Sequence, residues 1–292
     1  MKQIMMSLAL VVSLSACTQA QQSSNNSNDN AMNNTSEPSN KEKAVAVLNS
    51  LETGDESAIG YINPEKYIQH NLAVGDGLAG FGEVMAHAPE GGFKAKVVRA
   101  FTDGDYVFTH TEYDFFGDKV GFDVFRFEDG LIVEHWDNLL EKTPLNPSGR
   151  SQTDGPTEVG DLSATAANKE LVSRFIDDIL VNGKMNQVTQ YFDGDQYIQH
   201  NPAVADGLSG LGQALEAMAK QGVTMVYDKV HKVLGEGNFV LAISEGTFAG
   251  QATSYYDLFR VENGKITEHW DVMEPILPEA EWKNTNGKFN FK

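Results

Sequence analysis

The chain contains two sequence blocks that each occur twice, and this internal repeat constrains its fold more than any other feature. YIQHNLAVGDGLAG at 67–80 returns as YIQHNPAVADGLSG at 197–210, and FRFEDGLIVEHWD at 125–137 returns as FRVENGKITEHWD at 259–271. A repeat unit of this length can bury a core of its own. The sequence therefore predicts two equivalent globular domains rather than a solenoid.

The composition between the repeats predicts the domain boundaries. We expect a first domain at 41–145 and a second at 166–282, followed by a C-terminal tail at 283–292. Residues 146–165 are rich in Pro, Gly, Ser and Asp without apolar periodicity, which is typical of a linker.

The N-terminal segment resembles a bacterial lipoprotein signal. A short apolar run precedes Leu-Ser-Ala-Cys, which is similar to the lipobox, and Cys17 is the only cysteine of the chain. The resemblance implies a signal peptide at 1–16 and lipidation of Cys17, and Thr18 fits delivery to the outer membrane, facing the periplasm. An incidental cysteine in an ordinary signal peptide is the alternative. Residues 17–40 are mostly Gln, Asn, Ser and Thr, a composition typical of a disordered tether.

The charge of the chain limits its partners. The formal net charge is −19 at pH 7. A surface this acidic disfavours nucleic acid and direct binding to anionic lipids. We therefore expect contact with the membrane through the lipid anchor only.

Both copies show the same order of local patterns. Each opens with a helical pattern, at 41–55 and 169–185, and continues with the YIQHN block and a short helix. Strand patterns follow at 94–117 and 228–248, and each copy ends in the FRxExG hairpin. This order predicts an α+β fold in which helices pack on one face of a curved antiparallel sheet.

The hairpin carries a cluster of groups that can exchange protons. In LIVEHWD, strand alternation puts His135 and Asp137 on one face. A three-residue loop places Asp123 directly opposite His135, and the same count pairs Asp257 with His269. We prefer this loop because our count for a shorter one sets two carboxylates opposite each other.

The chemistry of this cluster leaves two interpretations open. A carboxylate beside an imidazole stabilises the charged ring, and such a pair can move protons near neutral pH. The same pair can also be purely structural. The YIQHN block is similarly open: Tyr67 and His70 either line a cavity, or Asn71 and Asn201 close a turn.

Together, the two blocks resemble the SnoaL-like polyketide cyclases of the nuclear transport factor 2 superfamily, including the branch described as aldol-condensation enzymes. The resemblance covers nearly all of both domains. It implies a cone of curved sheet around helices, a deep pocket, and acid-base chemistry on a carbonyl compound without metal or organic cofactor. The acid/base aspartate of the family matches Asp137 and Asp271, and its early pocket histidine matches His70 and His200.

The chain also departs from the family. Asp123 and Asp257 stand where the cyclases have a histidine on the penultimate strand. His110 of the first copy aligns with Ile243, which cannot donate a hydrogen bond to an oxyanion. We therefore expect the first domain to carry most of the activity.

These arguments define the candidate site residues. The candidate catalytic residues are Asp123, His135, Asp137 and His70 in the first domain, and Asp257, His269, Asp271 and His200 in the second. The candidate substrate-binding residues are Tyr67, Asn71, His110, Tyr197 and Asn201.

Three functions compete at this point. The first is an enzyme that moves a proton next to the carbonyl group of a small hydrophobic compound, and the second is a non-catalytic binder of such molecules. The third, a metal site of His70, His110, His135 and Asp123, matches no compact metal motif, so we expect no metal. We further expect the two domains to pair through their sheets as an intramolecular pseudo-dimer.

Overall fold

The computed structural model describes residues 37–291, and the chain from Pro38 onward forms one compact unit. The predicted signal peptide at 1–16, the predicted lipidation site Cys17 and nearly all of the predicted tether at 17–40 lie outside the described residues. Within the described part, no helix is both long enough and apolar enough to cross a membrane.

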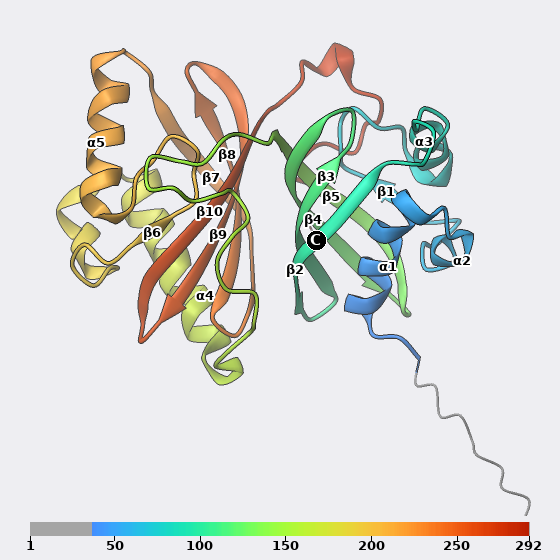
Figure 1. The fold of residues 1–292 in the computed structure, drawn as a ribbon, viewed down its shortest axis with the longest axis horizontal. Helices are drawn as coiled ribbons and strands as arrows, with labels where there is room; N and C mark the ends of the chain where they lie inside the picture. The colour runs from blue at the N-terminus through green and yellow to red at the C-terminus, as the bar shows by residue number, and fades with distance from the viewer. Residues whose placement is uncertain (1–36, 292) are drawn as a thin grey trace, which may run out of the picture. The chain divides into compact units, whose positions relative to one another are not determined.

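The compact unit consists of two halves with the same order of elements (Figure 1). The first half contains α1 (Asn40–Thr53), α2 (Glu56–Ile59), β1 (Ile68–Gln69), α3 (Gly77–Met85), β2 (Lys94–Asp103), β3 (Tyr106–Asp114), β4 (Asp118–Glu128) and β5 (Leu131–Glu141). The second half contains α4 (Thr165–Phe175), the π-helical turn Ile176–Val181, β6 (Ile198–Gln199), α5 (Gly207–Lys220), β7 (Met225–Glu236), β8 (Phe239–Phe248), β9 (Gln251–Glu262) and β10 (Lys265–Pro275). Short 3₁₀ turns lie at Leu162–Ala164, Met185–Gln190 and Glu279–Glu281.

Helix α1 shows how local sequence sets the ends of an element. Ser39 and Glu42 form a capping box at its start, and Gly54 ends it in the left-handed conformation at φ 66°. Its buried side carries Ala44, Val47, Leu48 and Leu51. These apolar side chains join the core between the helix and the sheet.

Each half has one five-stranded sheet, in the order β1-β5-β4-β3-β2 and β6-β10-β9-β8-β7. The four long strands of each sheet are antiparallel, whereas β1 and β6 pair parallel with β5 and β10. The predicted α+β fold with two tandem cone-shaped domains is confirmed. The parallel edge strand makes each sheet mixed, which the sequence patterns did not indicate.

The register of the β4–β5 hairpin differs from the prediction. Asp129 and Gly130 both have positive φ, so the turn has two residues and pairs Glu128 with Leu131. A bulge in β5 then shifts the pairing by one residue, and Asp123 lies directly opposite Asp137 instead of His135. The count from the sequence was wrong because it assumed a three-residue loop and contained no bulge, and in the second copy Asp257 likewise lies opposite Asp271 instead of His269.

The outer faces of the two sheets contribute to one apolar cluster. This cluster contains buried side chains of β2–β5, such as Phe108, Phe122 and Trp136, together with Leu241 and Trp270 of the second half. Both tryptophans are fully buried. The opposite face of each sheet is thereby left to form a pocket with the helices of its own half.

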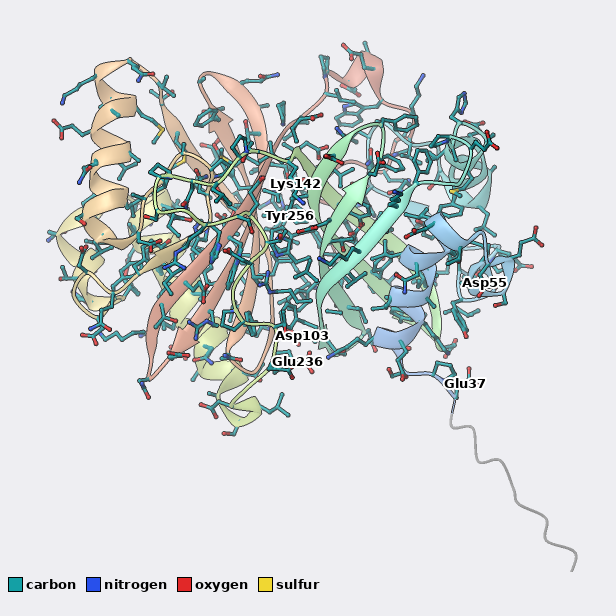
Figure 2. All side chains as sticks on the ribbon, in the orientation of Figure 1. Glu37, Asp55, Asp103, Lys142, Glu236 and Tyr256 are labelled. Carbon is teal, nitrogen blue, oxygen red and sulfur yellow. The ribbon has the colours of Figure 1, made fainter. Side chains whose placement is uncertain are left out.

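At one end of the sheets, one carboxylate side chain of each half contacts the other half (Figure 2). Asp103 at the end of β2 accepts a hydrogen bond of 2.9 Å from the Gly235 amide and pairs with Lys169. Glu236 of β7 accepts one of 2.7 Å from the Thr102 amide. The two contacts are reciprocal, because equivalent ends of β2 and β7 accept and donate in the same way.

Candidate functional site

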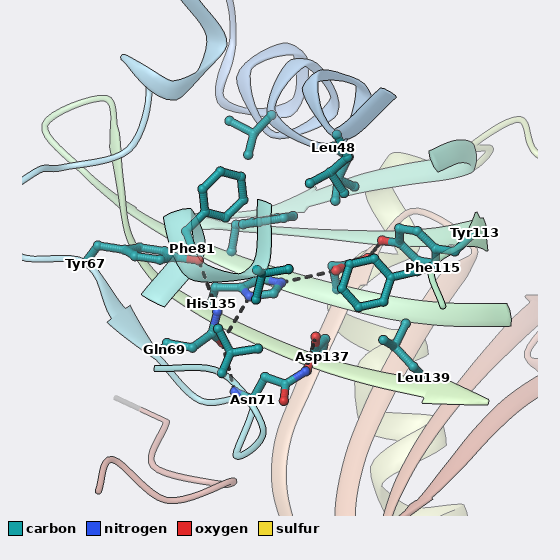
Figure 3. Close-up of a pocket in the computed structure, with 16 residues that line it drawn as sticks. Leu48, Tyr67, Gln69, Asn71, Phe81, Tyr113, Phe115, His135, Asp137 and Leu139 are labelled. Atoms are coloured by element: carbon teal, nitrogen blue, oxygen red, sulfur yellow. Dashed lines mark hydrogen bonds and ion pairs between the residues drawn. The ribbon is translucent and has the colours of Figure 1, made fainter. Parts of the chain in front are cut away.

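Each half contains a pocket between its helices and the inner face of its sheet. Pocket one lies in the first half and encloses about 650 Å³ including its mouth (Figure 3). Its walls are mainly apolar side chains, with polar groups at one side. The apolar walls include Val47, Leu48, Leu51, Phe81, Val84, Phe115, Phe125 and Leu139, and the polar groups are Tyr67, Gln69, Asn71, Tyr113, Asp123, His135 and Asp137.

The polar side of pocket one is built around Asp123, His135 and Asp137. The Nε2 atom of His135 lies 3.1 Å from Oδ1 of Asp123, diagonally across the β4–β5 pair. Asn71 donates to Oδ2 of Asp137 at 2.8 Å, whereas Oδ1 is buried without a hydrogen-bond partner. The structure thus brings together five of the predicted residues of this half: Tyr67, Asn71, Asp123, His135 and Asp137.

Gln69 fixes the protonation of His135. The Oε1 atom of Gln69 accepts a hydrogen bond of 2.8 Å from the Asn71 amide, so the atom facing His135 Nδ1 at 3.2 Å is an acceptor. Nδ1 must therefore carry a proton. The contact between Nε2 and Asp123 also needs one proton between two acceptors, and the pair then resembles an imidazolium beside a carboxylate.

Pocket two repeats this arrangement in the second half and encloses about 1080 Å³ including its mouth. His269 Nε2 lies 2.9 Å from Asp257 Oδ1, and His269 Nδ1 lies 3.0 Å from Gln199 Oε1. Asn201 donates to Asp271 Oδ2 at 2.6 Å. Oδ1 of Asp271 is again buried without a hydrogen-bond partner.

Burial and neighbouring charges shift the protonation of pocket two. Burial and the charge of Asp257 raise the pKa of Asp271, although the charge of His269 opposes them. Burial alone lowers the pKa of His269, but the hydrogen bond to Asp257 and the charge of Asp271 outweigh it, so the pKa is raised. Both shifts favour a proton within this cluster near neutral pH.

Two pairs of site residues were missed by the sequence argument. Gln69 and Gln199 orient the histidines, and their repetition in both YIQHN blocks was a signal for them. Tyr113 donates to Asp123, and Tyr227 donates to Asp257 at 3.2 Å. Burial raises the pKa of both phenols, so both remain donors.

Comparison of the two sequence copies did not reveal the tyrosines, because they come from strands that are not equivalent in the two halves. Tyr113 lies on β3 opposite Ala95 of β2, whereas Tyr227 lies on β7 opposite Gly246 of β8. An alignment of the two copies therefore pairs neither tyrosine with the other. The structure nevertheless brings both hydroxyl groups to the corresponding aspartate.

His70 and His200 do not belong to the pockets, which corrects their prediction as catalytic residues. Their rings stack on Trp136 and Trp270 with ring centroids 4.4 and 4.6 Å apart, on the outer face of the sheets. The reason is the pleat of β1 and β6. Gln69 points into the pocket, so the next residue points to the opposite face.

His110 also lies outside pocket one and is not a substrate-binding residue. Its ring is buried on the outer face, where it stacks on Phe122 and lies 2.8 Å from Arg99. Burial and the Arg99 charge hold the pKa of His110 well below its usual value. The difference between His110 and Ile243 therefore gives no reason for unequal activity of the two domains.

One trio could ligate a metal ion. Ligand atoms of Asp123, His135 and Asp137 all lie within 4.8 Å of one another. The Lys288 ammonium, however, lies 3.9 Å from Asp137 Oδ1 and already supplies a positive charge there. The four residues considered as an alternative metal site do not come together in pocket one, because His70 and His110 lie on the outer face.

Comparison with protein families identifies one domain type. The family model described as the SnoaL-like domain matches residues 172–269, from α4 to β10. This range contains Asp257 and His269 and ends shortly before Asp271. No curated protein matches the chain.

Solved structures similar to the chain are mostly of single-domain length. IdmH, a candidate polyketide cyclase from Streptomyces antibioticus, is 19% identical, with 35% of this chain and 92% of IdmH covered and a TM-score of 0.30. An LEH-like epoxide hydrolase from M. tuberculosis is 21% identical, with 38% and 84% covered and a TM-score of 0.29. An NTF2-like protein of unknown function from Cytophaga hutchinsonii is 20% identical, with 41% and 96% covered and a TM-score of 0.29.

Proposed function

We propose that this protein, whose second half is a SnoaL-like domain and whose first half repeats that fold, catalyses acid-base chemistry on a small hydrophobic carbonyl compound. The reaction class is aldol condensation, cyclisation or isomerisation. Each pocket contains a proton acceptor and proton donors among its own side chains, so the chemistry requires no cofactor.

The observation that carries the proposal is a single carboxylate oxygen in each pocket. Oδ1 of Asp137 and Oδ1 of Asp271 are buried without a hydrogen-bond partner, while Asn71 and Asn201 hold the other oxygen. A carboxylate oxygen that is held in place and makes no hydrogen bond is free to accept a proton from a bound substrate. This geometry is suited to a general base.

The neighbouring groups complete the reaction in pocket one. Asp137 removes the proton next to the carbonyl, so a C–H bond breaks and an O–H bond forms on the carboxyl group. The electron pair moves to the carbonyl oxygen. The positive charge of the His135 ring stabilises this enolate, and Asp123, which accepts from Tyr113, holds the ring in place. The enolate then takes the proton back from Asp137 at another carbon, or attacks a second carbonyl, whose oxygen takes that proton.

The pocket walls support a hydrophobic substrate. Aliphatic and phenylalanine side chains, among them Leu48, Phe81 and Phe115, line most of pocket one around the polar cluster. Pocket two adds Met218, Met225 and Met273, which are unbranched and adapt to different shapes. We propose that pocket two accepts the larger compounds of the same class.

A substrate-independent base assay tests the proposal. The probe is 5-nitrobenzisoxazole: a base removes its ring proton, the N–O bond breaks, and a coloured cyanophenolate is released. We expect the double variant Asp137→Asn/Asp271→Asn to lose about 10²–10⁴-fold of the turnover, the usual contribution of a general base. A control is the double variant Asp118→Asn/Asp177→Asn, at two exposed positions, one in each half, that line neither pocket.

Non-catalytic binding of hydrophobic molecules is the second candidate, favoured by the apolar walls. If the Asp137→Asn/Asp271→Asn variant turns the probe over as fast as the wild type, the enzyme proposal fails. Native mass spectrometry of the protein with cell extract then identifies the bound compounds.

We further propose that the chain is an outer-membrane lipoprotein that faces the periplasm and acts as a monomer. The lipobox-like sequence before Cys17 supports the anchor, and the apolar cluster shared by both sheets supports an intramolecular pseudo-dimer. Cys17→Ser should release the protein from the membrane fraction. Light scattering should give the mass of one chain.

A further inference from the structure

Two segments cross from one half to the other and contact the loop that follows YIQ. The C-terminal strap, residues 282–291, lies against the first half, and the linker strap, residues 143–156, lies against the second half. The straps share a sequence pattern, because NTNGK at 284–288 corresponds to NPSGR at 146–150. They are therefore a third repeated element.

The first asparagine of each strap makes the same contacts. Asn284 donates to the carbonyls of Asn71 and Val74 at 2.7 and 2.9 Å. Asn146 donates to the carbonyls of Gln199, Asn201 and Val204 at 2.7, 3.5 and 3.0 Å, and the last two are equivalent to Asn71 and Val74. Asn284 and Asn146 are both buried, with 5% of their surface exposed.

Further contacts connect the C-terminal strap to the pocket loop. Asn286 donates to the Gln69 carbonyl and to Asp76, both at 2.9 Å. Asp76 in turn accepts a hydrogen bond of 2.9 Å from the Gln69 amide. The strap thus holds the backbone of Gln69 and Asn71, whose side chains contact His135 and Asp137.

Lys288 makes the C-terminal strap different from the linker strap. Its ammonium donates to the Asp137 carbonyl at 2.7 Å, lies 3.9 Å from Asp137 Oδ1 and pairs with Glu274 of β10. The Lys288 side chain is 6% exposed. At the corresponding position, Arg150 pairs instead with Asp206 at 2.7 Å, and its side chain is 34% exposed.

We propose that the C-terminal strap of the second half completes pocket one. Asn284 and Asn286 are positioning residues for the loop from Gln69 to Val74, and Lys288 is the buried cation that stabilises the charged form of Asp137. This assignment rests on the proposed base role of Asp137. The charged groups around Lys288 are Asp137 of β5 and Glu274 of β10, and Asp123 and His135 lie on the far side of Asp137.

The consequence is a functional difference between the two pockets. In the described part of the chain, the cation of the linker strap binds Asp206 rather than Asp271. Pocket one then works as a base at lower pH than pocket two. The C-terminal strap, which follows the second domain in the sequence, thus determines the chemistry of pocket one in the first domain.

The positioning role is tested by amide hydrogen exchange of the full chain, because peptides from the two repeats differ in sequence. We expect Asn284→Ala and Lys288→Met to increase exchange at 67–76 by about tenfold and to leave 197–206 unchanged. The matched variant Asn146→Ala should do the reverse. Unchanged exchange at 67–76 in both strap variants would overturn the positioning role.

The charge role is tested by the pH profile of 5-nitrobenzisoxazole turnover in an Asp271→Asn background, which leaves only pocket one. Removing a cation 3.9 Å from the carboxylate lets it take up a proton more readily, so Lys288→Met should move the acidic limb upward by about one to three pH units. Lys288→Arg should restore the limb. A loss of packing alone would lower the rate without moving the limb.

The two proposals fail in different ways. If the acidic limb of the pH profile does not move in Lys288→Met, the charge role is overturned, whatever the turnover rate of the variant. If the wild type shows no turnover that depends on Asp137 or Asp271, the proposed function fails. The exchange experiment then decides the strap by itself, because it requires no catalysis.

Discussion

Pocket one and pocket two contain the same arrangement of polar groups, but one of these groups comes from a different strand in each pocket. In both, an asparagine holds an aspartate, a glutamine orients a histidine, and that histidine pairs with a second aspartate. The tyrosine on the second aspartate, however, comes from β3 in pocket one and from β7 in pocket two. The comparison shows that the position of the hydroxyl group is retained although the residue that supplies it is not.

Steric crowding explains why the tyrosine changes strand. A Cβ atom at Gly246 would lie 1.9 Å from the Val226 carbonyl oxygen, so position 246 cannot carry the tyrosine that β3 has at position 113. The β7–β8 pairing contains two register shifts, whereas the β2–β3 pairing contains one. The extra bulge directly follows Tyr227, whose hydroxyl group donates to Asp257.

The largest effect is expected when each pocket loses its base separately. At the acidic end of the pH range, Asp137→Asn should remove about tenfold more of the 5-nitrobenzisoxazole turnover than Asp271→Asn, because the pKa of Asp271 is raised and this carboxyl group keeps its proton to higher pH. The gap should narrow toward pH 8. Steady-state rates of the two variants across this range measure it. Equal losses at every pH would show that the pockets are equivalent.

This expectation resembles the one drawn from the sequence but has another cause. The sequence argument used His110, which lies on the outer face of the sheet and cannot act on a substrate in pocket one. The structural reason is the raised pKa of Asp271 in pocket two and the Lys288 ammonium beside Asp137 in pocket one. A difference between two aligned residues was informative only once their faces were known.

The sequence predicted the fold well because the duplication and the strand alternation are both visible directly in the order of residues. Alternation placed His135 and Asp137 on one face, and both line pocket one. The register failed at the β5 bulge, and His70 failed because the family motif did not show which residue of the two-residue strand β1 points inward. Lys288 was not predictable, because its contact with Asp137 crosses 151 residues of chain.

The steric explanation is tested by adding one methyl group to β8. Gly246→Ala should destabilise the protein by about 1–3 kcal/mol, the usual cost of forcing a side chain into a closely packed site. Gly212→Ala is the matched control in the same half, because a Cβ there meets nothing within 4 Å and the residue lies inside α5. It should stabilise by about 0.5–1 kcal/mol. Urea unfolding at neutral pH measures both; a neutral Gly246→Ala variant would contradict the explanation.

The smallest expected effect is a pH dependence of stability that comes from pocket two. Because the pKa of His269 is raised in the folded state, its contribution is fully present below about pH 6.5 and is lost as the pH rises through the folded pKa. The raised pKa of Asp271 acts in the same direction, since the folded state holds that proton more tightly than the unfolded chain does. Stability should therefore fall as the pH rises above about 6.5, and His269→Gln should flatten the decline in urea unfolding. His87→Gln, at an exposed histidine of the first half, is the control and should leave the slope unchanged. If stability changes with pH equally in the wild type and in His269→Gln, His269 has the same protonation in the folded and the unfolded chain. The inferred proton between His269 and Asp257 would then be wrong.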